Sequence, residues 1–283
     1  MKVDINGIDL EVMKQGNGET ILFVHGSNGD YRTWNAQQSE FAKHFHTISY
    51  SRRYHYPNEK ITEDADYAMV EHLDDLQKFI QSLDGKPVHL AGHSYGAFLS
   101  LLLAIREPQL IRTLILEEPP IFTLFITIPP KPQEILKLLV TRPQTAIAII
   151  RFAMTGLNPA TVAAERDDMD EALRIFGSAI LGTETYNKMS PERLEQARIN
   201  NFKAELLGSG FMPLDETHVS HIQTPTLLIN GANSPALFHR FIDRLHELLP
   251  HSERIKISDA SHIIHEDNPT AYNKAVLSFI EQN

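Results

Sequence analysis

The chain has 283 residues, 42% of them hydrophobic, which suffices for one large domain, alone or with an inserted subdomain; it has no cysteine, so disulfides, thiolate chemistry and cysteine-ligated metals are excluded. The formal net charge is −10 and no basic run is longer than Arg52-Arg53, so nucleic acid and anionic membranes are poor partners. The N-terminus lacks a signal-peptide pattern and no window approaches ~18 uncharged apolar residues, so we expect a cytoplasmic protein without a transmembrane helix.

The first part of the chain alternates between strand-like and helix-like runs. Residues 2–14 alternate in polarity around Asn6-Gly7, which predicts a β-hairpin. Short apolar runs predict four strands, at residues 20–24, 46–50, 87–91 and 112–116. Apolar residues at helical spacing predict a helix over 64–83. Strands that alternate with helices indicate an α/β fold, with a mostly parallel β-sheet flanked by helices on both faces.

This rhythm stops between residues 121 and 221. Helix-like runs with a proline near each start lie at Pro132–Val140, Pro143–Thr155, Pro159–Phe176 and Pro191–Leu207. The sheet pattern resumes with strands at 224–229 and 254–257 and helices at 235–249 and 269–281. We therefore expect a core formed by residues 1–120 and 222–283, with a helical cap inserted at 121–221.

The sequence Gly92-His93-Ser94-Tyr95-Gly96 joins the strand at 87–91 to a helix-like run at 97–106. A sharp turn from strand to helix strains the backbone at its apex, so the residues two before and two after the serine must be small. The serine hydroxyl then projects above the sheet, and the N–H of Tyr95 is directed at the same space. Ser94 is therefore a candidate nucleophile.

A serine hydroxyl needs a base, an acid that orients the base, and hydrogen-bond donors for the developing oxyanion. His262 lies in the loop after the last strand, at the sheet edge where chemistry gathers in open α/β folds. His265 competes with it, three residues further on, where we expect a helix to begin. The N–H of Ser27, which follows His25-Gly26, is a candidate second oxyanion donor.

These motifs resemble the α/β-hydrolase-fold family, in its small, cap-bearing form with a serine nucleophile. The residues that carry the resemblance are His25-Gly26-Ser27, Gly92-His93-Ser94-Tyr95-Gly96 and Ala260-Ser261-His262, in the family's order along nearly the whole chain. The helical stretch falls where the family inserts its cap. The resemblance implies Ser94 as nucleophile, His262 as general base and then acid, and the Ser27 and Tyr95 amides as oxyanion hole. It implies no metal and no cofactor.

The position of the acid departs from the family's usual pattern. After the strand at 224–229 the family commonly has an aspartate, but here Ser234 occupies that place. Some members carry the acid one strand earlier, where this chain has Glu117-Glu118. Two adjacent carboxylates are costly to bury without partners, and alternation along a strand lets one of them face His262. Glu118 is preferred to Glu117, with Asp215 as a third candidate.

The residues of the substrate pocket are less well specified by the sequence. Where the family commonly has Arg-Gly-x-Gly, the chain reads Arg53-Tyr54-His55-Tyr56, so Tyr54, His55 and Tyr56 either line the pocket or pack beneath the cap. His25 and Phe122 are the other pocket candidates. The acidic run at 167–171 is interpreted as a solvated helix face and not as a metal site.

The sequence thus predicts a hydrolase that acts on a small-molecule substrate, namely a small, fairly apolar ester, thioester or lactone, through an acyl-enzyme on Ser94. One alternative is carbon–carbon bond hydrolysis or acyl transfer by the same residues. Another is a ligand-binding protein that has lost catalysis. Haloalkane dehalogenases and epoxide hydrolases of this fold have an aspartate as nucleophile in the turn between strand and helix, the elbow. This chain has Ser94 there, which argues against both activities.

Overall fold

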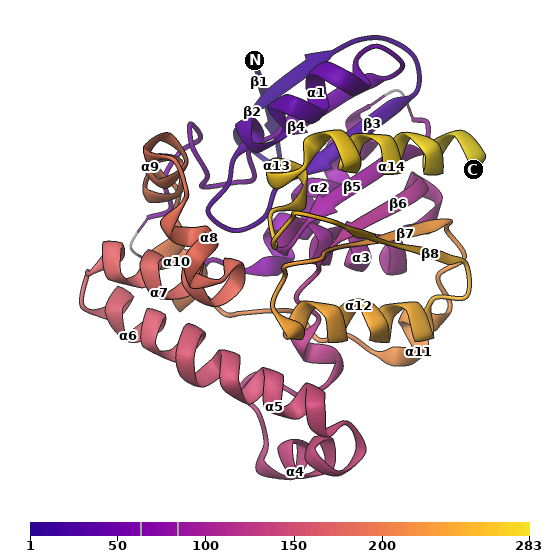
Figure 1. The fold of residues 1–283 in the computed structure, drawn as a ribbon. Helices are drawn as coiled ribbons and strands as arrows, with labels where there is room; N and C mark the ends of the chain where they lie inside the picture. The colour runs from indigo at the N-terminus through magenta and orange to yellow at the C-terminus, as the bar shows by residue number, and fades with distance from the viewer. Residues whose placement is uncertain (63, 84) are drawn as a thin grey trace.

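The computed structural model describes residues 1–62, 64–83 and 85–283. Eight strands form one sheet in the order β1-β2-β4-β3-β5-β6-β7-β8 (Figure 1). The strands are β1 (Lys2–Ile5), β2 (Ile8–Gln15), β3 (Thr20–Val24), β4 (His46–Tyr50), β5 (Val88–His93), β6 (Ile111–Glu117), β7 (Thr226–Gly231) and β8 (Ser252–Ile257). β1 and β2 pair as an antiparallel hairpin, β2 also runs antiparallel to β4, and the remaining pairs are parallel. The predicted mostly parallel sheet is confirmed.

Helices cover both faces of this sheet (Figure 1). Leu22 and Val24 of β3 point into a core shared with α2 (Met69–Ser82), α3 (Tyr95–Arg106) and α12 (Ala236–Leu248). Their neighbours Ile21 and Phe23 point into the opposite core, formed with η1 (Tyr31–Trp34), α1 (Asn35–Phe41), α13 (Ile264–Asp267) and α14 (Pro269–Gln282). This alternation is what a strand buried on both faces requires. A short 3-10 turn, η2 (Pro108–Leu110), leads into β6.

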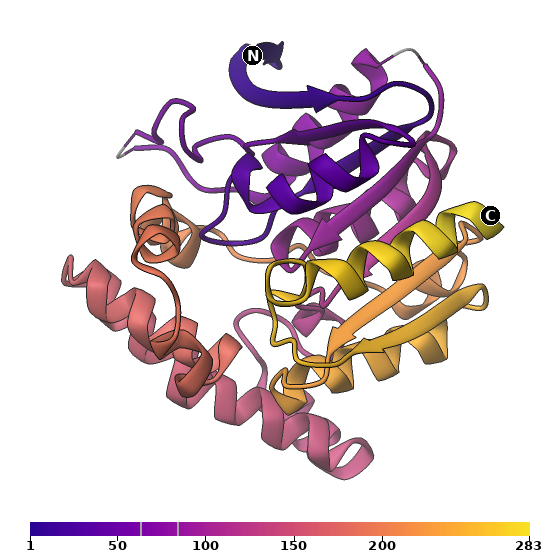
Figure 2. The same ribbon diagram turned by 45° about the horizontal axis from the view of Figure 1, so that its top comes forward.

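The chain between β6 and β7 forms the helical cap, and none of its residues, all of which are described, lies in a strand (Figure 2). Its elements are η3 (Phe122–Leu124), α4 (Pro132–Thr141), α5 (Pro143–Phe152), the π-helix η4 (Ala153–Leu157), α6 (Asn158–Glu165), α7 (Met169–Leu181), α8 (Thr183–Asn187), α9 (Pro191–Ile199), α10 (Phe202–Leu207) and α11 (Glu216–Ser220). Prolines begin α4, α5 and α9, where a missing N–H costs little.

Two of the predicted cap helices are wrong in extent. The run Pro159–Phe176 is broken because Asp167 adopts φ 61° and the side chain of Asp168 caps α7 by accepting a hydrogen bond from the Glu171 amide at 3.2 Å. The run Pro191–Leu207 is broken after α9, where Asn200 takes an extended backbone and opens the turn before α10. Both breaks use polar residues whose side chains compete with helical hydrogen bonds.

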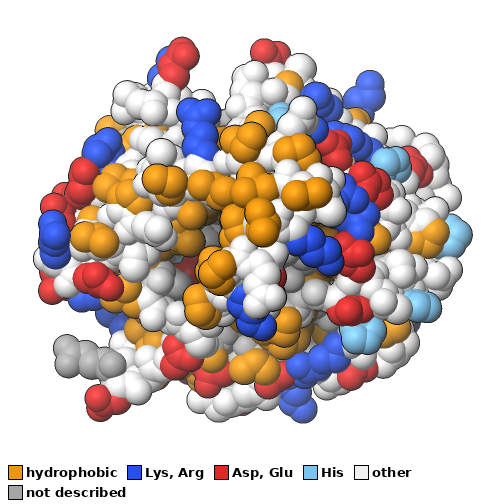
Figure 3. All heavy atoms as spheres, turned by 90° about the horizontal axis from the view of Figure 1, so that it is seen from below, with side chains coloured by type: hydrophobic (Ala, Val, Ile, Leu, Met, Phe, Trp, Pro, Cys, Tyr) orange, Lys and Arg blue, Asp and Glu red, His pale blue; other side chains and the backbone are white. Residues whose placement is uncertain are grey.

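The stretch Pro143–Glu165, which comprises α5, η4 and α6, is long and apolar enough to cross a membrane by length and composition, a measure that core helices also satisfy. The sequence-based expectation that no segment is long and apolar enough to cross a membrane does not hold for this stretch. One side of it is buried in the protein, as at Ile149, whereas Ile147, Met154 and Val162 are exposed. Hydrophobic side chains gather across the face of the molecule seen from below (Figure 3).

The turn after β5 depends on two close backbone approaches. A Cβ on Gly92 would lie 2.6 Å from the carbonyl oxygen of Gly96, and a Cβ on Gly96 would collide with the carbonyl oxygens of Val24 and His25. Ser94 between them has φ 50° and ψ −116°, a conformation that a non-glycine residue rarely adopts. Both glycines are therefore required by space, as the sequence predicted.

We expect Gly96→Ala to lower the free energy of unfolding by at least about 2 kcal/mol, because the added methyl meets backbone atoms that have no rotamer to escape into. Gly7→Ala is the matched comparator, since Gly7 has φ 78° but nothing within 4 Å of an added Cβ, and we expect it to cost about 1 kcal/mol. Urea unfolding of both variants measures the difference. Equal losses in the two variants would contradict the argument.

Candidate active site

Ser94 lies at the junction of β5 and α3, with its amide donating a hydrogen bond to the Glu117 carbonyl at 2.8 Å. This bond and the positive φ hold the residue above the carboxyl end of the sheet. Ser94 and His262 line the same cavity. Within the described residues no hydrogen bond joins the Ser94 hydroxyl to the His262 ring; such bonds commonly tighten only when substrate binds.

The His262 ring is fixed by a buried carboxylate. Its Nδ1 donates to Glu118 Oε2 at 2.6 Å, and the two side chains are 1% and 0% exposed. Glu118 Oε1 accepts a second hydrogen bond, from the Gly231 amide at 3.0 Å. With Nδ1 bound in this way, Nε2 is the ring nitrogen left to accept a proton. Phe238 stacks on the ring with centroids 3.9 Å apart.

The three candidate acids have different partners. Glu118 contacts His262, whereas Glu117 contacts His265. Asp215 is 61% exposed and caps α11 by accepting from the Thr217 amide at 2.8 Å. The structure therefore brings together Glu118 and His262 from strand ends 144 residues apart and leaves Asp215 outside the site.

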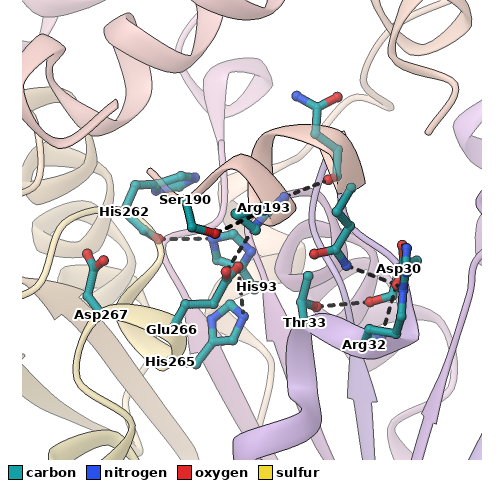
Figure 4. A network of polar contacts seen from close by, with 12 residues as sticks. Asp30, Arg32, Thr33, His93, Ser190, Arg193, His262, His265, Glu266 and Asp267 are labelled. Carbon is teal, nitrogen blue, oxygen red and sulfur yellow. Dashed lines mark hydrogen bonds and ion pairs between the residues drawn. The ribbon is translucent and has the colours of Figure 1, made fainter. Parts of the chain in front are cut away.

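A second histidine–carboxylate pair lies behind the first. Glu117 bonds His265 Nδ1 at 2.9 Å and the His265 amide at 3.2 Å, and Trp34 stacks on the imidazole with centroids 4.0 Å apart. His93 lies beside both pairs: its Nε2 donates to the His262 carbonyl at 2.9 Å (Figure 4), and its ring packs against that of His265 with centroids 4.9 Å apart. From the sequence, Glu117 and His265 were alternative candidates for the acid and the base, but their pairing with one another was not predicted.

Burial raises the pKa of Glu117, although His265 opposes this. Burial would lower the pKa of His265, but the Glu117 carboxylate and the hydrogen bond to it outweigh burial and raise that pKa overall. Ligand-type atoms of His93, Glu117 and His265 lie within 4.8 Å of one another, the spacing of a metal site. Glu117 is already bonded to His265, and His93 to a carbonyl, so the cluster is explained as a hydrogen-bonded network.

Ser27 and Tyr95, whose amides are the predicted oxyanion donors, both line the cavity beside Ser94. Neither amide donates a hydrogen bond to another part of the described chain. The loop that carries Ser27 is held by His25, which accepts from the Arg52 amide at Nε2, 2.9 Å away, and donates from Nδ1 to the Gly26 carbonyl at 2.8 Å. Burial, with the nearby Arg52 charge, lowers the pKa of His25 well below its usual range, so this ring stays neutral.

The Ser27 side chain contacts the cap. Its hydroxyl donates to Glu205 of α10, and Glu205 also faces Nη2 of the buried Arg52 at 3.3 Å. Arg52 lies over the Tyr95 ring, with Cζ 4.2 Å from the centroid. Neither the position of Glu205 nor the contacts of Arg52 could be predicted from the sequence, because no local motif surrounds either residue.

The cavity between core and cap measures about 470 Å³. Apolar and aromatic residues form most of its wall, among them Phe122, Ile126, Ile149, Phe152, Leu157, Ile180, Phe202, Phe211 and Phe238. A much smaller recess of about 50 Å³, lined by Asn28 and Arg193, also reaches Ser94 and His262. Of the predicted pocket residues, Phe122 lines the large cavity.

The other pocket candidates line neither space. This corrects the expectation for His25, and for Tyr54, His55 and Tyr56 it corrects the pocket assignment in favour of the alternative that they pack beneath the cap. His25 is buried below the Ser27 loop, and His55 bonds the Gly29 carbonyl at 2.8 Å. Tyr54 packs against the rings of Tyr67 and His72, and Tyr56 is 43% exposed beneath Arg32. These tyrosine and histidine side chains support the loops below the cap, and Tyr67 reaches the cavity instead.

Polar contacts attach the cap to the loops around the site. Arg193 of α9 bonds Glu266 at 2.8 Å and the Asn28 carbonyl at 3.1 Å (Figure 4). Gln196, one turn further along α9, bonds Asp30 at 2.9 Å. Arg193 thereby spans from the loop next to Ser27 to the helix after His262.

Residues 19–269 match the family described as the alpha/beta hydrolase fold. The chain belongs to this family. This match covers most of the core and the whole cap, and it agrees with the strand order, the serine at the elbow and the histidine after the last strand.

Several known proteins are similar to the chain in sequence. It is 28% identical to the uncharacterized hydrolase YraK of Bacillus subtilis over 117 residues. This matched stretch covers 41% of this chain and 43% of that protein. It is 24% identical over 294 residues to the 2-(acetamidomethylene)succinate hydrolase of Mesorhizobium japonicum, covering 99% and 94% of the two chains. It is 22% identical to the (E)-2-((N-methylformamido)methylene)succinate hydrolase of Acinetobacter baylyi, covering 95% and 92%.

Solved structures show the same fold. A thermophilic esterase from Thermogutta terrifontis, with malate bound, has a TM-score of 0.71 at 19% identity, covering 100% of this chain and 98% of that one. The meta-cleavage product hydrolase CumD has a TM-score of 0.65 at 16% identity, with the same coverage.

We expect Glu118→Gln to lower kcat by about 10³-fold or more, because the amide cannot stabilise an imidazolium as the carboxylate does. Asp215→Asn is the matched control. It also replaces a carboxylate by an amide, but at the exposed N-cap position of α11, and it should leave kcat unchanged. The measurement is steady-state turnover of an ester substrate by the two variants. Near-wild-type turnover in Glu118→Gln would overturn the assignment of the acid.

The raised pKa values of Glu117 and His265 give a pH dependence of known sign. A group whose pKa is higher in the folded than in the unfolded protein stabilises the fold at low pH. This contribution is lost as the pH rises; for His265 the loss begins near the unfolded pKa of about 6.5 and continues through the raised folded pKa. We expect the wild-type free energy of unfolding to fall more steeply with pH than that of the double variant Glu117→Gln/His265→Asn. Urea unfolding between about pH 5 and 9 tests this; parallel curves would contradict it.

Proposed function

We propose that the protein is a serine hydrolase that acts through an acyl-enzyme on Ser94. The observation that carries this proposal is the buried hydrogen bond between Glu118 and His262, both on the sheet edge that holds Ser94. A carboxylate at Nδ1 leaves Nε2 available as the general base, and the cavity gives a substrate access to both residues.

In this mechanism the Ser94 hydroxyl attacks the substrate carbonyl while His262 Nε2 takes its proton. The Glu118 carboxylate stabilises the resulting imidazolium, and the Ser27 and Tyr95 amides bind the oxyanion. The intermediate collapses when His262 returns the proton to the leaving alcohol or thiol. A water molecule, deprotonated by His262, then attacks the acyl carbonyl. As the bond to Ser94 breaks, His262 returns the proton to the Ser94 oxygen, which releases the carboxylic acid and restores the free serine.

The cavity supports a small and fairly apolar ester, thioester or lactone as substrate. Its volume of about 470 Å³ suits a small organic molecule, and its wall is mostly apolar. Some of the polar groups of the wall, at Ser27, Tyr67 and Glu205, are bonded to one another beside the Ser27 loop, and the cap adds Asn158, Thr161 and Ser209.

A second candidate is hydrolysis of another bond by the same residues. The full-length relatives are named as hydrolases of substituted succinates, and one structural neighbour as a meta-cleavage product hydrolase. These names favour testing carboxylated amides and carbon–carbon substrates beside the esters. A ligand-binding protein without catalysis is the third candidate, and an unreactive Ser94 would favour it.

Intact-mass analysis after treatment with a fluorophosphonate probe tests the proposal directly. We expect one adduct on the wild type, none on Ser94→Ala, and labelling slowed about 10²-fold or more in Glu118→Gln, because the probe reports on the activated serine. Ser234→Ala is the control for a second serine near the site and should label like the wild type. Failure of the wild type to label, with the fold intact, would rule out the serine-hydrolase proposal.

A further inference from the structure

The large cavity contains one carboxylate in a mostly apolar wall. Among the described residues that line it, Glu205 is the single Asp, Glu, Lys or Arg. Its side chain is 10% exposed, so it meets the cavity without facing bulk solvent. A charged group in such a place acts strongly on the charge of whatever enters, because little water screens it.

Three partners hold this carboxylate in place. Ser27 donates its hydroxyl to Oε1, and Oε2 accepts from the Tyr67 hydroxyl at 3.2 Å and from Arg52 Nη2 at 3.3 Å. Ser27 and Tyr67 come from core loops, whereas Glu205 comes from α10 of the cap. These contacts fix the carboxylate beside the oxyanion loop.

Arg52 does not offer its charge to the cavity. Its side chain is 1% exposed and absent from the cavity wall, and its guanidinium also bonds the carbonyls of His25 and Gly26, each at 3.2 Å. Glu205 contacts this buried cation and itself lines the cavity, whereas Arg52 does not. A group that enters meets the negative end of the pair.

The small recess that also reaches Ser94 is lined by two arginines, and both are already paired. Arg193 bonds the Glu266 carboxylate and the Asn28 carbonyl, and Arg198 bonds Asp170 at 2.8 Å. The recess measures about 50 Å³, which is too small for a chain of several carbon atoms. An anionic arm of a substrate has no free cation to bind in either space among the described residues.

We propose that Glu205 makes the large cavity selective for uncharged groups and excludes carboxylated ones. The inference rests on the proposed function, and it specifies the class of substrate: an ester, thioester or lactone whose longer arm carries no negative charge. Glu205 acts here as a specificity-determining residue, contributed by the cap, for a reaction performed by the core.

Matched esters test the proposal. The first pair, p-nitrophenyl hexanoate and mono-p-nitrophenyl adipate, differs by a carboxylate on the acyl side; the second, the 4-acetylphenyl and 4-carboxyphenyl esters of hexanoic acid, differs on the alcohol side. For the pair whose variable arm enters the cavity, we expect the wild-type kcat/KM to favour the neutral ester by about tenfold or more, the size of an interaction between like charges at low screening.

Glu205→Gln should reduce this preference by about tenfold or reverse it, because Arg52 then lies behind an uncharged amide. Glu165→Gln removes the same charge from an exposed position at the end of α6 and should leave the ratio unchanged. A ratio near one in the wild type for both pairs, or a ratio that Glu205→Gln does not change, would overturn the proposal. The wild-type ratio decides even where a variant does not fold.

Binding of 2-heptanone and 6-oxoheptanoate, measured by calorimetry, gives a readout without turnover. The wild type should bind the neutral ketone more tightly by about tenfold, and Glu205→Gln should narrow the gap. Discrimination between the ketones without ester turnover would contradict the proposed function alone. Turnover of esters without discrimination would contradict the role of Glu205 alone.

Discussion

Two adjacent carboxylates buried at the carboxyl end of β6 determine how the C-terminal part of the site is built. A buried carboxylate is costly unless it is paired, so Glu117, the last residue of β6, and Glu118, which follows it with φ 46°, each need a partner. His265 and His262 meet this need, each 1% exposed. The segment after β8 is thus tied at two points to the end of β6, and His93 at the end of β5 holds it at a third point, by donating to the His262 carbonyl.

The same constraint explains why the loop after β7 needs no acid. The carboxylate bonded to His262 is that of Glu118, the residue after β6, and β7 contributes instead the backbone amide of Gly231, which donates to Glu118. A side chain on Gly231 would collide with the carbonyl oxygens of Ala260 and Ser261. Close approach of backbone therefore takes the place of an acidic side chain there, and Ser234, where the family commonly has that acid, has a hydroxyl without a partner among the described residues.

Sequence reasoning reached the features that are encoded locally. The Asn6-Gly7 hairpin, the strand periods and the small residues around Ser94 each leave a short pattern, and the missing acid at Ser234 directed attention to Glu118. The features that could not be predicted are contacts between residues far apart in the sequence. Glu205 meets Ser27 across 178 residues and Arg52 across 153, and no pattern in the cap marks it. The assignment of Tyr54 and Tyr56 to the pocket was wrong for a related reason, since the composition of a loop does not reveal which of its side chains face the cavity.

The division of labour between core and cap follows from these contacts. The core supplies Ser94, His262 and Glu118 from strand ends, whose positions are fixed by hydrogen bonds of the sheet and by buried pairing. The cap supplies most of the cavity wall and, among the described residues that line it, the one carboxylate. It is attached through polar side chains such as Arg193 and Glu205, which reach the loops next to Ser94 and His262. Exposed ion pairs contribute little to stability, but these are largely buried and fix geometry. Changes in cap sequence can therefore alter which substrate is accepted while the chemistry of the sheet edge stays the same.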